Sequence, residues 1–145
     1  MKVSTKGRYA LRMMLDLAEY QQDNYVSLKD IAARQNISKK YLEQIVPLLS
    51  RNGFLRTNRG NMGGYRLAKN PENYTVGDIL RATEGSLAPV SCLEYEENDC
   101  PRAGECSTLF IWSGLYKVIN DYLDNITLQN IIDHQNQTSG NDYCI

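Results

Sequence analysis

The stretch from Ser27 to Leu67 reads SLKDIAARQNISKKYLEQIVPLLSRNGFLRTNRGNMGGYRL and indicates the fold of the chain. Ser27 is a suitable N-cap for a first helix, in which apolar residues recur at i, i+3 and i+4. Ser38 is a suitable N-cap for a second helix with a clear apolar face. That face consists of Leu42, Ile45, Val46 and Leu49. These signals predict two helices joined by a tight turn at 35–36.

A β-hairpin is predicted to follow the second helix. Asn52-Gly53 ends that helix, because glycine readily takes the left-handed conformation of a helix cap. The segments 54–57 and 64–67 then flank the glycine-rich tip NRGNMGG as two short strands. Two helices and a hairpin with a basic tip describe a winged helix-turn-helix. The predicted fold class is mainly α with a small β-hairpin and a long dimerisation helix.

The polar face of the second helix predicts contact with DNA. Recognition helices enter the major groove with their N-terminal residues first. Gln44 can pair with adenine, Glu43 can only accept hydrogen bonds, and lysines suit phosphates. On the wing, Arg59 has slim neighbours that would let its guanidinium enter a narrow minor groove. The predicted DNA surface comprises Lys6, Ser27, Ser38, Lys39, Lys40, Tyr41, Glu43, Gln44, Arg59 and Gly60. The alternative is a solvated amphipathic helix beside an ordinary hairpin.

Length and composition favour one globular domain outside the membrane. The chain has 145 residues, 42% of them hydrophobic, which is enough for a core. It contains no apolar run of about 18 residues, the length that a membrane span needs. Charges are spread through the first 20 residues, unlike a signal peptide. We expect a cytoplasmic protein without a membrane partner.

The charge is divided between the two halves of the chain. Residues 1–69 carry 13 Lys and Arg against 5 Asp and Glu, a net +8. Residues 70–145 carry 3 against 12, a net −9, and the two halves sum to the overall −1. A basic head on an acidic body confines the attraction for phosphates to one end.

The remaining sequence predicts a first helix over 8–21, with Lys2, Lys6 and Arg8 at its start. Cations are unfavourable at that end of a helix dipole, so a phosphate partner explains them better than stability does. Thr75 can cap a short helix that stops at Gly85. We expect a winged helix-turn-helix head over 1–70, a cysteine loop with dimerisation helices over 71–135, and a flexible tail over 136–145.

A further helix is predicted from 107 to 124, with the alternating three- and four-residue spacing of a coiled-coil seam. The seam consists of Leu109, Trp112, Tyr116, Ile119 and Leu123. Two such helices would bury their seams against each other in a homodimer. The alternative is that this face covers the chain's own core.

Three cysteines, Cys92, Cys100 and Cys106, lie within 15 residues in SCLEYEENDCPRAGEC. Structural disulfides are rare in the cytosol, so a metal site is favoured. Zinc sites usually use closer cysteine pairs, whereas wide gaps in a loop suit an iron–sulfur cluster held by thiolates. A cluster is favoured, redox thiols or no metal come next, and zinc is the third possibility.

Several motifs together resemble the IscR-type regulators of the Rrf2 family. They are STKGRYALRMMLDLA, YLEQIVPLL, RGNMGGYRLA, VGDILRATEG and the triple-cysteine loop followed six residues later by Trp112. The resemblance runs from Met1 to about Asp133. It implies a homodimeric winged-helix transcription factor, a repressor in our expectation, that binds a palindromic operator and controls iron–sulfur cluster assembly or related responses.

The resemblance also implies roles for single residues. By position, Cys92, Cys100 and Cys106 match the three cluster cysteines of these regulators. Tyr41, Glu43 and Gln44 match the recognition-helix contacts, and Arg59 matches the wing arginine. The family's usual [2Fe–2S] cluster is the first choice and [4Fe–4S] the second. Where enterobacterial relatives have a histidine ligand, this chain has Leu109, so the fourth ligand is unidentified; His134 is expected at the surface.

A second branch of the family, the CymR regulators of cysteine metabolism, lacks a cluster and acts with cysteine synthase. The chain shares with that branch a C-terminal isoleucine, in the ending Tyr143-Cys144-Ile145. The alternative function is therefore a cluster-free repressor of cysteine metabolism whose tail docks on cysteine synthase. No nucleophile–base pair, phosphate-binding loop or catalytic carboxylate pair emerges from the sequence, so we expect no enzyme activity.

Overall fold

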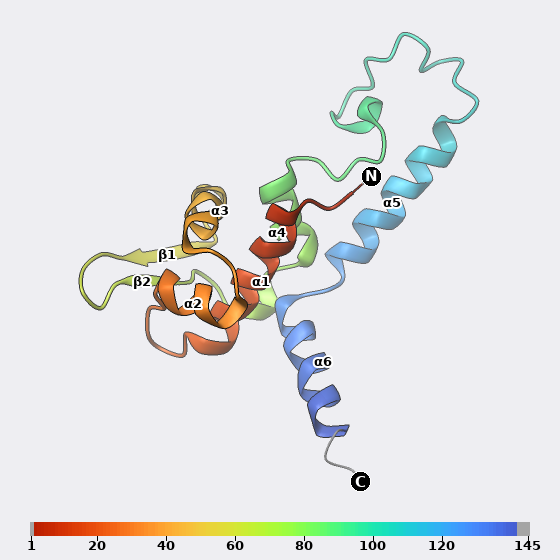
Figure 1. The fold of residues 1–145 in the computed structure, drawn as a ribbon. Helices are drawn as coiled ribbons and strands as arrows, with labels where there is room; N and C mark the ends of the chain where they lie inside the picture. Colours follow the sequence, from red (N-terminus) through yellow and green to blue (C-terminus); the bar gives the residue numbers. More distant parts are fainter. Residues whose placement is uncertain (1, 142–145) are drawn as a thin grey trace.

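The computed structural model describes residues 2–141 and consists of a compact head and two projecting helices (Figure 1). The head contains α1 (Thr5–Tyr20), α2 (Leu28–Gln35), α3 (Lys39–Arg51), β1 (Leu55–Asn58) and β2 (Gly64–Leu67). A 3-10 turn, η1 (Pro71–Asn73), leads into α4 (Val76–Glu84), and a second, η2 (Ser91–Leu93), lies in the cysteine segment. The chain continues through α5 (Leu109–Asp124) and α6 (Leu128–Asn141). The winged helix-turn-helix fold is confirmed.

The two helices of the helix-turn-helix begin at the predicted caps. The Ser27 hydroxyl accepts a hydrogen bond from the Asp30 amide at 3.1 Å, and the Ser38 hydroxyl accepts one from the Tyr41 amide at 3.1 Å. Asn36, between the helices, adopts the left-handed conformation with φ 53°. The apolar face predicted for α3 is buried. Local capping thus explains where both helices start.

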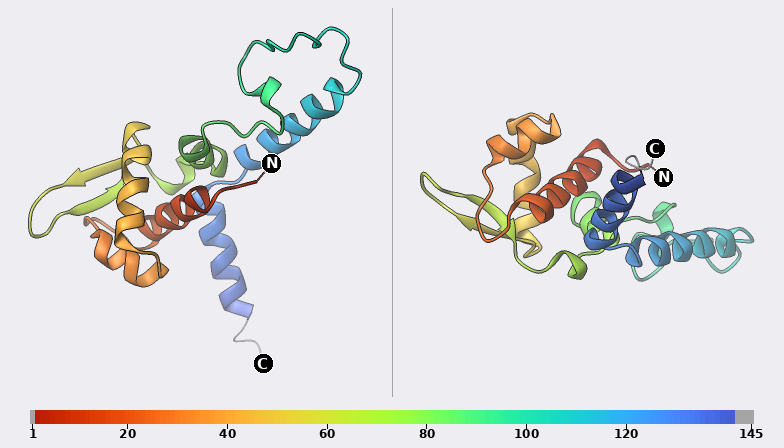
Figure 2. Two further views of the ribbon diagram at one scale, coloured as in Figure 1. Left: turned by 45° about the horizontal axis from the view of Figure 1, so that its top comes forward. Right: turned by 90° about the horizontal axis from the view of Figure 1, so that it is seen from below.

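The hairpin has the predicted position, with its first strand starting one residue later. Leu55 pairs with Leu67, Arg56 with Arg66, Thr57 with Tyr65 and Asn58 with Gly64. Gly60, at the tip, has φ +121°, a conformation that side-chain-bearing residues avoid. The hairpin points away from α5 in both views of the ribbon (Figure 2).

Helix α1 starts about one turn earlier than the predicted 8–21. Ser4 is its N-cap, and the Ser4 hydroxyl accepts a hydrogen bond from the Gly7 amide at 3.1 Å. Lys6 and Arg8 therefore lie within the first turn. Ala10, Met13, Met14 and Leu17 of α1 are fully buried and form the centre of the core.

A buried carboxylate joins α1 to the helix-turn-helix. Asp16 is 0% exposed, and the Arg34 guanidinium donates two hydrogen bonds to it, at 2.8 and 3.0 Å. The Gln35 amide donates a third at 2.9 Å. The hydrogen bond to Asp16 is the main reason that the pKa of Arg34 is raised. All these contacts reach the C-terminal end of α2, so they fix α2 against α1.

The head shares its core with elements from beyond residue 70. Tyr74 is 1% exposed; its hydroxyl donates to the Phe54 carbonyl at 2.9 Å and accepts from the Lys69 amide at 3.0 Å. Ile79 of α4 and Leu128 of α6 are fully buried in the same apolar cluster as the α1 residues. The predicted boundary at residue 70 therefore does not separate two hydrophobic cores.

Helix α6 corrects the prediction that a flexible tail starts at residue 136. The helix continues to Asn141. Thr127 caps it by accepting from the Asn130 amide at 3.1 Å, and the Thr138 hydroxyl donates to the His134 carbonyl at 2.9 Å. Polar residues without a proline interruption can continue a helix that is already capped and packed at its start. Residues 142–145 lie outside the described residues, and so does the predicted docking ending.

None of the helices between residues 2 and 141 is both long and apolar enough to cross a membrane.

The buried ion pair yields a stability prediction. Substitution Asp16→Ala leaves a charged guanidinium and an amide without their acceptor. We expect a loss of about 3 kcal/mol in the free energy of unfolding, at the low end for a broken buried pair because Arg34 is partly exposed. Urea unfolding followed by circular dichroism measures this. Asp23→Ala, at an exposed turn, is the matched control, and equal stabilities of the two variants would contradict the assignment.

Candidate nucleic-acid interface and cysteine segment

The recognition helix presents its predicted DNA-facing residues at the surface. Ser38, Lys39, Lys40, Glu43 and Gln44 are exposed on the N-terminal half of α3. Tyr41 is half-buried, and its ring meets that of Tyr9 of α1 edge-on, with centroids 5.2 Å apart. The polar groups of this half-helix are therefore available to a ligand, while Tyr41 is supported from behind by α1.

The wing carries more positive charge than the sequence motifs alone indicated. Arg59 and Gly60 are exposed at the tip, as predicted. In addition, Arg56 and Arg66 are direct cross-strand partners. Like charges placed opposite each other destabilise a hairpin, and a phosphate between or beside them would relieve the repulsion. The signal that could have revealed them is the register of the hairpin, which places these two arginines on one face.

Arg66 also has an incompletely satisfied guanidinium. Its Nε is buried and has no hydrogen-bond partner among the described residues. One terminal nitrogen donates to the Asp23 carbonyl over a long 3.5 Å, and the guanidinium lies over the Tyr25 ring at 5.8 Å. We add Arg56 and Arg66 to the candidate DNA surface.

Two further predicted DNA residues lie at helix starts. Ser27 is half-buried, and its hydroxyl is occupied in capping α2, so any contact with DNA would use its remaining hydrogen-bonding capacity or the adjacent helix start. Lys6 is half-buried in the first turn of α1. The Ser4 N-cap preceding it is bonded to Glu84, the last residue of α4.

The cysteine segment is irregular apart from η2 and forms a long arch between α4 and α5 (Figure 1). Cys92 and Cys100 are half-buried free thiols that line one surface hollow, together with the carboxylates of Glu94 and Asp99. Cys106 is a free, exposed thiol next to the start of α5. Within residues 2–141, no three His, Cys, Asp or Glu side chains are grouped closely enough to hold a metal ion.

The surroundings of Cys106 favour its thiolate form. Its Sγ lies 3.5 Å from the Thr108 hydroxyl, and hydrogen bonding from Thr108 lowers the pKa of the thiol. The backbone amides that start α5 act in the same direction. A thiol with a lowered pKa is the more ready metal ligand or redox group. Leu109, at the position of the expected fourth ligand, offers an apolar side chain, and His134 is exposed on α6.

The predicted seam of α5 is divided between two surroundings. Tyr116, Ile119 and Leu123 pack against a second apolar cluster formed by Val76, Leu80 and Leu87. These three residues thus cover the chain's own α4, as the alternative interpretation held. Leu109 and Trp112 lie in the first turn of α5, next to the cysteine segment.

A neighbouring face of α5 is apolar and open. The large exposed apolar residues of α5 are Phe110, Ile111, Trp112, Leu115, Val118 and Tyr122. Their exposed fractions run from 36% for Trp112 to 75% for Phe110. Of these, Ile111, Leu115, Val118 and Tyr122 recur at three- and four-residue spacing and share this open face. A contiguous apolar face of this kind marks an interaction surface.

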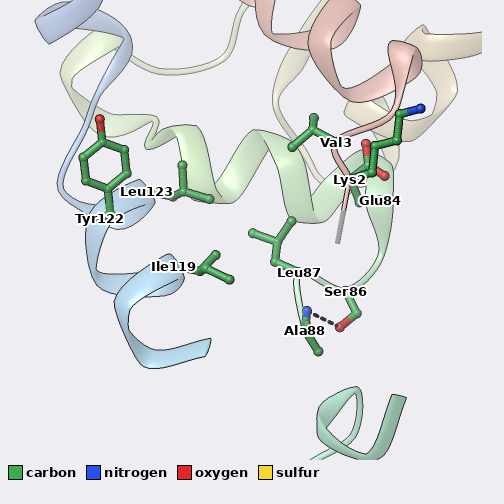
Figure 3. Close-up of a pocket in the computed structure, with 9 residues that line it drawn as sticks. All are labelled: Lys2, Val3, Glu84, Ser86, Leu87, Ala88, Ile119, Tyr122 and Leu123. Carbon is green, nitrogen blue, oxygen red and sulfur yellow. Dashed lines mark hydrogen bonds between the residues drawn. The ribbon is translucent and has the colours of Figure 1, made fainter. Parts of the chain in front are cut away.

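A cavity of about 300 Å³ lies where the N-terminal segment, the end of α4 and α5 meet (Figure 3). It is mostly apolar in its lining, which includes Leu87, Ile119 and Leu123. Glu84 and Lys2 provide charged groups at its edge.

Comparison with known proteins identifies the family. Residues 3–134 match the family model Rrf2, described as iron-dependent transcriptional regulator. The chain is a member of the Rrf2 family of transcriptional regulators.

Relatives of this Rrf2 regulator carry different names. It is 42% identical over 132 residues to protein rrf2 of Nitratidesulfovibrio vulgaris, covering 91% of this chain and 87% of that protein. Identity is 40% to the regulator CymR of Bacillus subtilis, over 90% of this chain and 89% of CymR. It is 38% to the regulator IscR of Pectobacterium atrosepticum, over 93% of this chain and 81% of IscR.

Solved structures show the same two resemblances. CymR, titled the global cysteine regulator of B. subtilis, superposes with a TM-score of 0.75 at 36% identity, covering 92% of this chain and 98% of CymR. T. potens IscR superposes with a TM-score of 0.72 at 36% identity, covering 93% and 88%. The family and fold are therefore shown, and overall similarity does not choose between the IscR and CymR branches.

The wing of this Rrf2 regulator yields a prediction for DNA binding. Arg59→Ala and Arg56→Ala each remove an exposed cation from the hairpin. We expect each to weaken duplex binding and to reduce the slope of log K against log salt by about 0.9 for every phosphate that is no longer neutralised. Fluorescence anisotropy titrations over a range of salt concentrations provide the measurement. Lys117→Ala, at an exposed position of α5, should leave the slope unchanged; equal slopes for all variants would exclude the wing from the interface.

Proposed function

We propose that the protein is a homodimeric, cytoplasmic DNA-binding repressor whose affinity for a palindromic operator responds to an iron–sulfur cluster or to redox state. It is not proposed to be an enzyme. The observation that carries the sensing role is the segment with Cys92, Cys100 and Cys106. All three thiols are free, and the segment leads directly into α5, the helix with the open apolar face.

The donor chemistry of the cysteine segment fits a cluster. Thiolates are the ligands that iron–sulfur clusters use, and the irregular backbone allows three thiols to approach one another. Cys92, Cys100 and Cys106 would hold the group, and the [2Fe–2S] type is favoured over [4Fe–4S]. Glu94 and Asp99 share the hollow with two of the cysteines and are the candidates of this chain for the missing fourth ligand. When bound, the cluster would supply sensitivity to iron supply and to oxidants.

The segment can influence DNA binding because of its connections. It starts after α4, which packs on α1, and ends at α5. Ordering of the segment would bias the separation of the two recognition helices in a dimer. Glu43 would convert that bias into selectivity between DNA sites. An unpaired carboxylate facing a phosphate costs energy, and a small tilt of the recognition helix relieves that cost.

The metal content tests the sensing role most directly. Protein purified without oxygen should contain iron and acid-labile sulfide, and it should absorb visible light. Cys→Ala at 92, 100 or 106 should abolish the absorbance, whereas Cys144→Ala should not. Stoichiometric zinc without sulfide would replace the cluster by a zinc site, and the absence of any metal would reject cluster sensing.

A second candidate is a cluster-free repressor of cysteine metabolism that acts with cysteine synthase. The similarity to CymR, at an identity close to that of IscR, supports this candidate as much as the first. A tail ending in a carboxylate and an apolar side chain could dock beside backbone amides. Co-purification with cysteine synthase, compared between the full chain and a variant lacking residues 143–145, separates the two candidates. Equal amounts of cysteine synthase retained by both forms would exclude the tail as its docking site.

The homodimer is proposed to use the open face of α5 together with Leu109 and Trp112 of the predicted seam. The remaining seam residues, Tyr116, Ile119 and Leu123, would support the interface from behind through their contacts with α4. Burial of large apolar side chains between two subunits provides the driving force for such an interface.

The position of the interface can be tested at Val118, which is 64% exposed. Val118→Asp places a charge in the proposed interface without disturbing the core of one chain. The mass in solution should fall from that of two chains to that of one, 16.5 kDa. Multi-angle light scattering measures this mass. Gln137→Asp adds the same charge on exposed α6 and should remain dimeric; a dimeric Val118→Asp variant would place the interface elsewhere.

A further inference from the structure

Glu84 forms a long-range contact that the DNA-binding and sensing roles leave unexplained. Its Oε1 accepts a hydrogen bond from the Ser4 amide at 3.0 Å and another from the Ser4 hydroxyl at 2.5 Å. The oxygen of the same hydroxyl accepts from the Gly7 amide at 3.1 Å. One carboxylate oxygen at the end of α4 thus holds the N-cap of α1, 80 positions earlier in the chain.

The start of α1 needs this carboxylate for an electrostatic reason. The positive end of a helix dipole favours acids in the first turn. Here the first turn contains no acidic residue and instead carries Lys6 and Arg8. Glu84 brings a negative charge to this helix start from another element. The arrangement keeps the two cations in place at an end of the helix where they are otherwise unfavourable.

The backbone at Gly7 is shaped to admit Glu84. Gly7 is buried, and a Cβ built on it would collide with Oε1 of Glu84 and lie 3.3 Å from a methyl carbon of Leu80. The close approach of α4 to α1 therefore depends on the absence of a side chain at this position.

The start of α1 is in turn connected to the recognition helix. Lys6 precedes Tyr9 by three residues, so the two lie on one face of α1. Tyr9 packs edge-on against Tyr41 in the first turn of α3. A displacement of the first turn of α1 would move Lys6 and loosen the support of Tyr41 together.

We propose that Glu84 is a positioning residue for DNA binding, which holds the start of α1 so that Lys6 meets a backbone phosphate and Tyr9 supports the recognition helix. The inference rests on the proposed DNA-binding function and adds to it a residue that itself does not touch DNA. The cavity beside Glu84 gives the carboxylate space to move into when its hydrogen bonds with Ser4 are broken (Figure 3).

The direction of the change in DNA affinity distinguishes a positioning role of Glu84 from an effect of net charge alone. Removal of any carboxylate should strengthen binding to a polyanion if only the net charge matters. Loss of positioning has the opposite effect. Glu84→Ala should therefore bind a duplex of arbitrary sequence at low salt more weakly than wild type, with a slope of log K against log salt reduced by about 0.9 for each phosphate left without its cation. Glu72→Ala removes the same charge at an exposed site of η1 and should bind at least as tightly as wild type.

Two more variants separate positioning from folding. Glu84→Gln keeps an oxygen that can accept both hydrogen bonds from Ser4 but loses the negative charge, so it should bind more tightly than Glu84→Ala. Gly7→Ala keeps every charge but displaces the carboxylate, and should weaken binding as Glu84→Ala does. Alanine is the better helix former, so loss of α1 would not explain that result. Circular dichroism reports whether each variant is folded.

The proposal is overturned if Glu84→Ala and Gly7→Ala bind with the wild-type slope, or if Glu84→Gln fails as badly as Glu84→Ala. In those cases the wild-type protein binds DNA, and the proposed function stands. Failure of the wild-type protein to bind any duplex would overturn the proposed function, and this inference with it.

Discussion

The contact of Asp16 with Arg34 and Gln35 is the constraint on which the DNA-reading head depends. A carboxylate at 0% exposure must have its hydrogen bonds satisfied, and three of them come from the last turn of α2. The position of α2 on α1 therefore has little freedom, and α3 follows through the tight turn at Asn36. The guanidinium of Arg34 also lies over the Tyr20 ring, at 4.2 Å from its centroid. Arg34 therefore contacts the C-terminal end of α1 as well.

From this fixed head, two connections lead to the rest of the molecule. At one end of α4, Tyr74 bonds to the segments on either side of the hairpin; at the other end, Glu84 bonds to the start of α1. Helix α5 is attached to α4 by Arg81, which donates to Asn120 and Asp124 at 2.8 Å, and by the apolar cluster beneath it. The cysteine segment runs from the C-terminal end of α4 to the N-terminal start of α5. A change in that segment can thus reach the head through α4 and α5.

The sequence predicted the elements whose signals are local and missed the contacts that depend on distant residues. Ser27, Ser38 and Thr75 cap the helices that follow them, so spacing alone identified three helix starts. The early start of α1 depends on Ser4, whose partner Glu84 is far along the chain. In α5, apolar residues occupy two adjacent faces, and periodicity cannot say which face covers the chain's own core. The cross-strand pair of arginines required the register of the hairpin, and the extent of α6 required its packing.

The central claim is that two winged heads read a palindrome in a way that depends on the cysteine segment. In vitro selection of duplexes from a random-sequence library tests it most directly, performed with anaerobically prepared protein and with a variant lacking Cys92, Cys100 and Cys106. We predict that both select inverted repeats, because the proposed dimer does not depend on the cysteines, and that the enriched half-sites differ between them. Identical motifs from both proteins would contradict the sensing role of the segment, and the absence of any inverted repeat would contradict the dimeric reading of DNA.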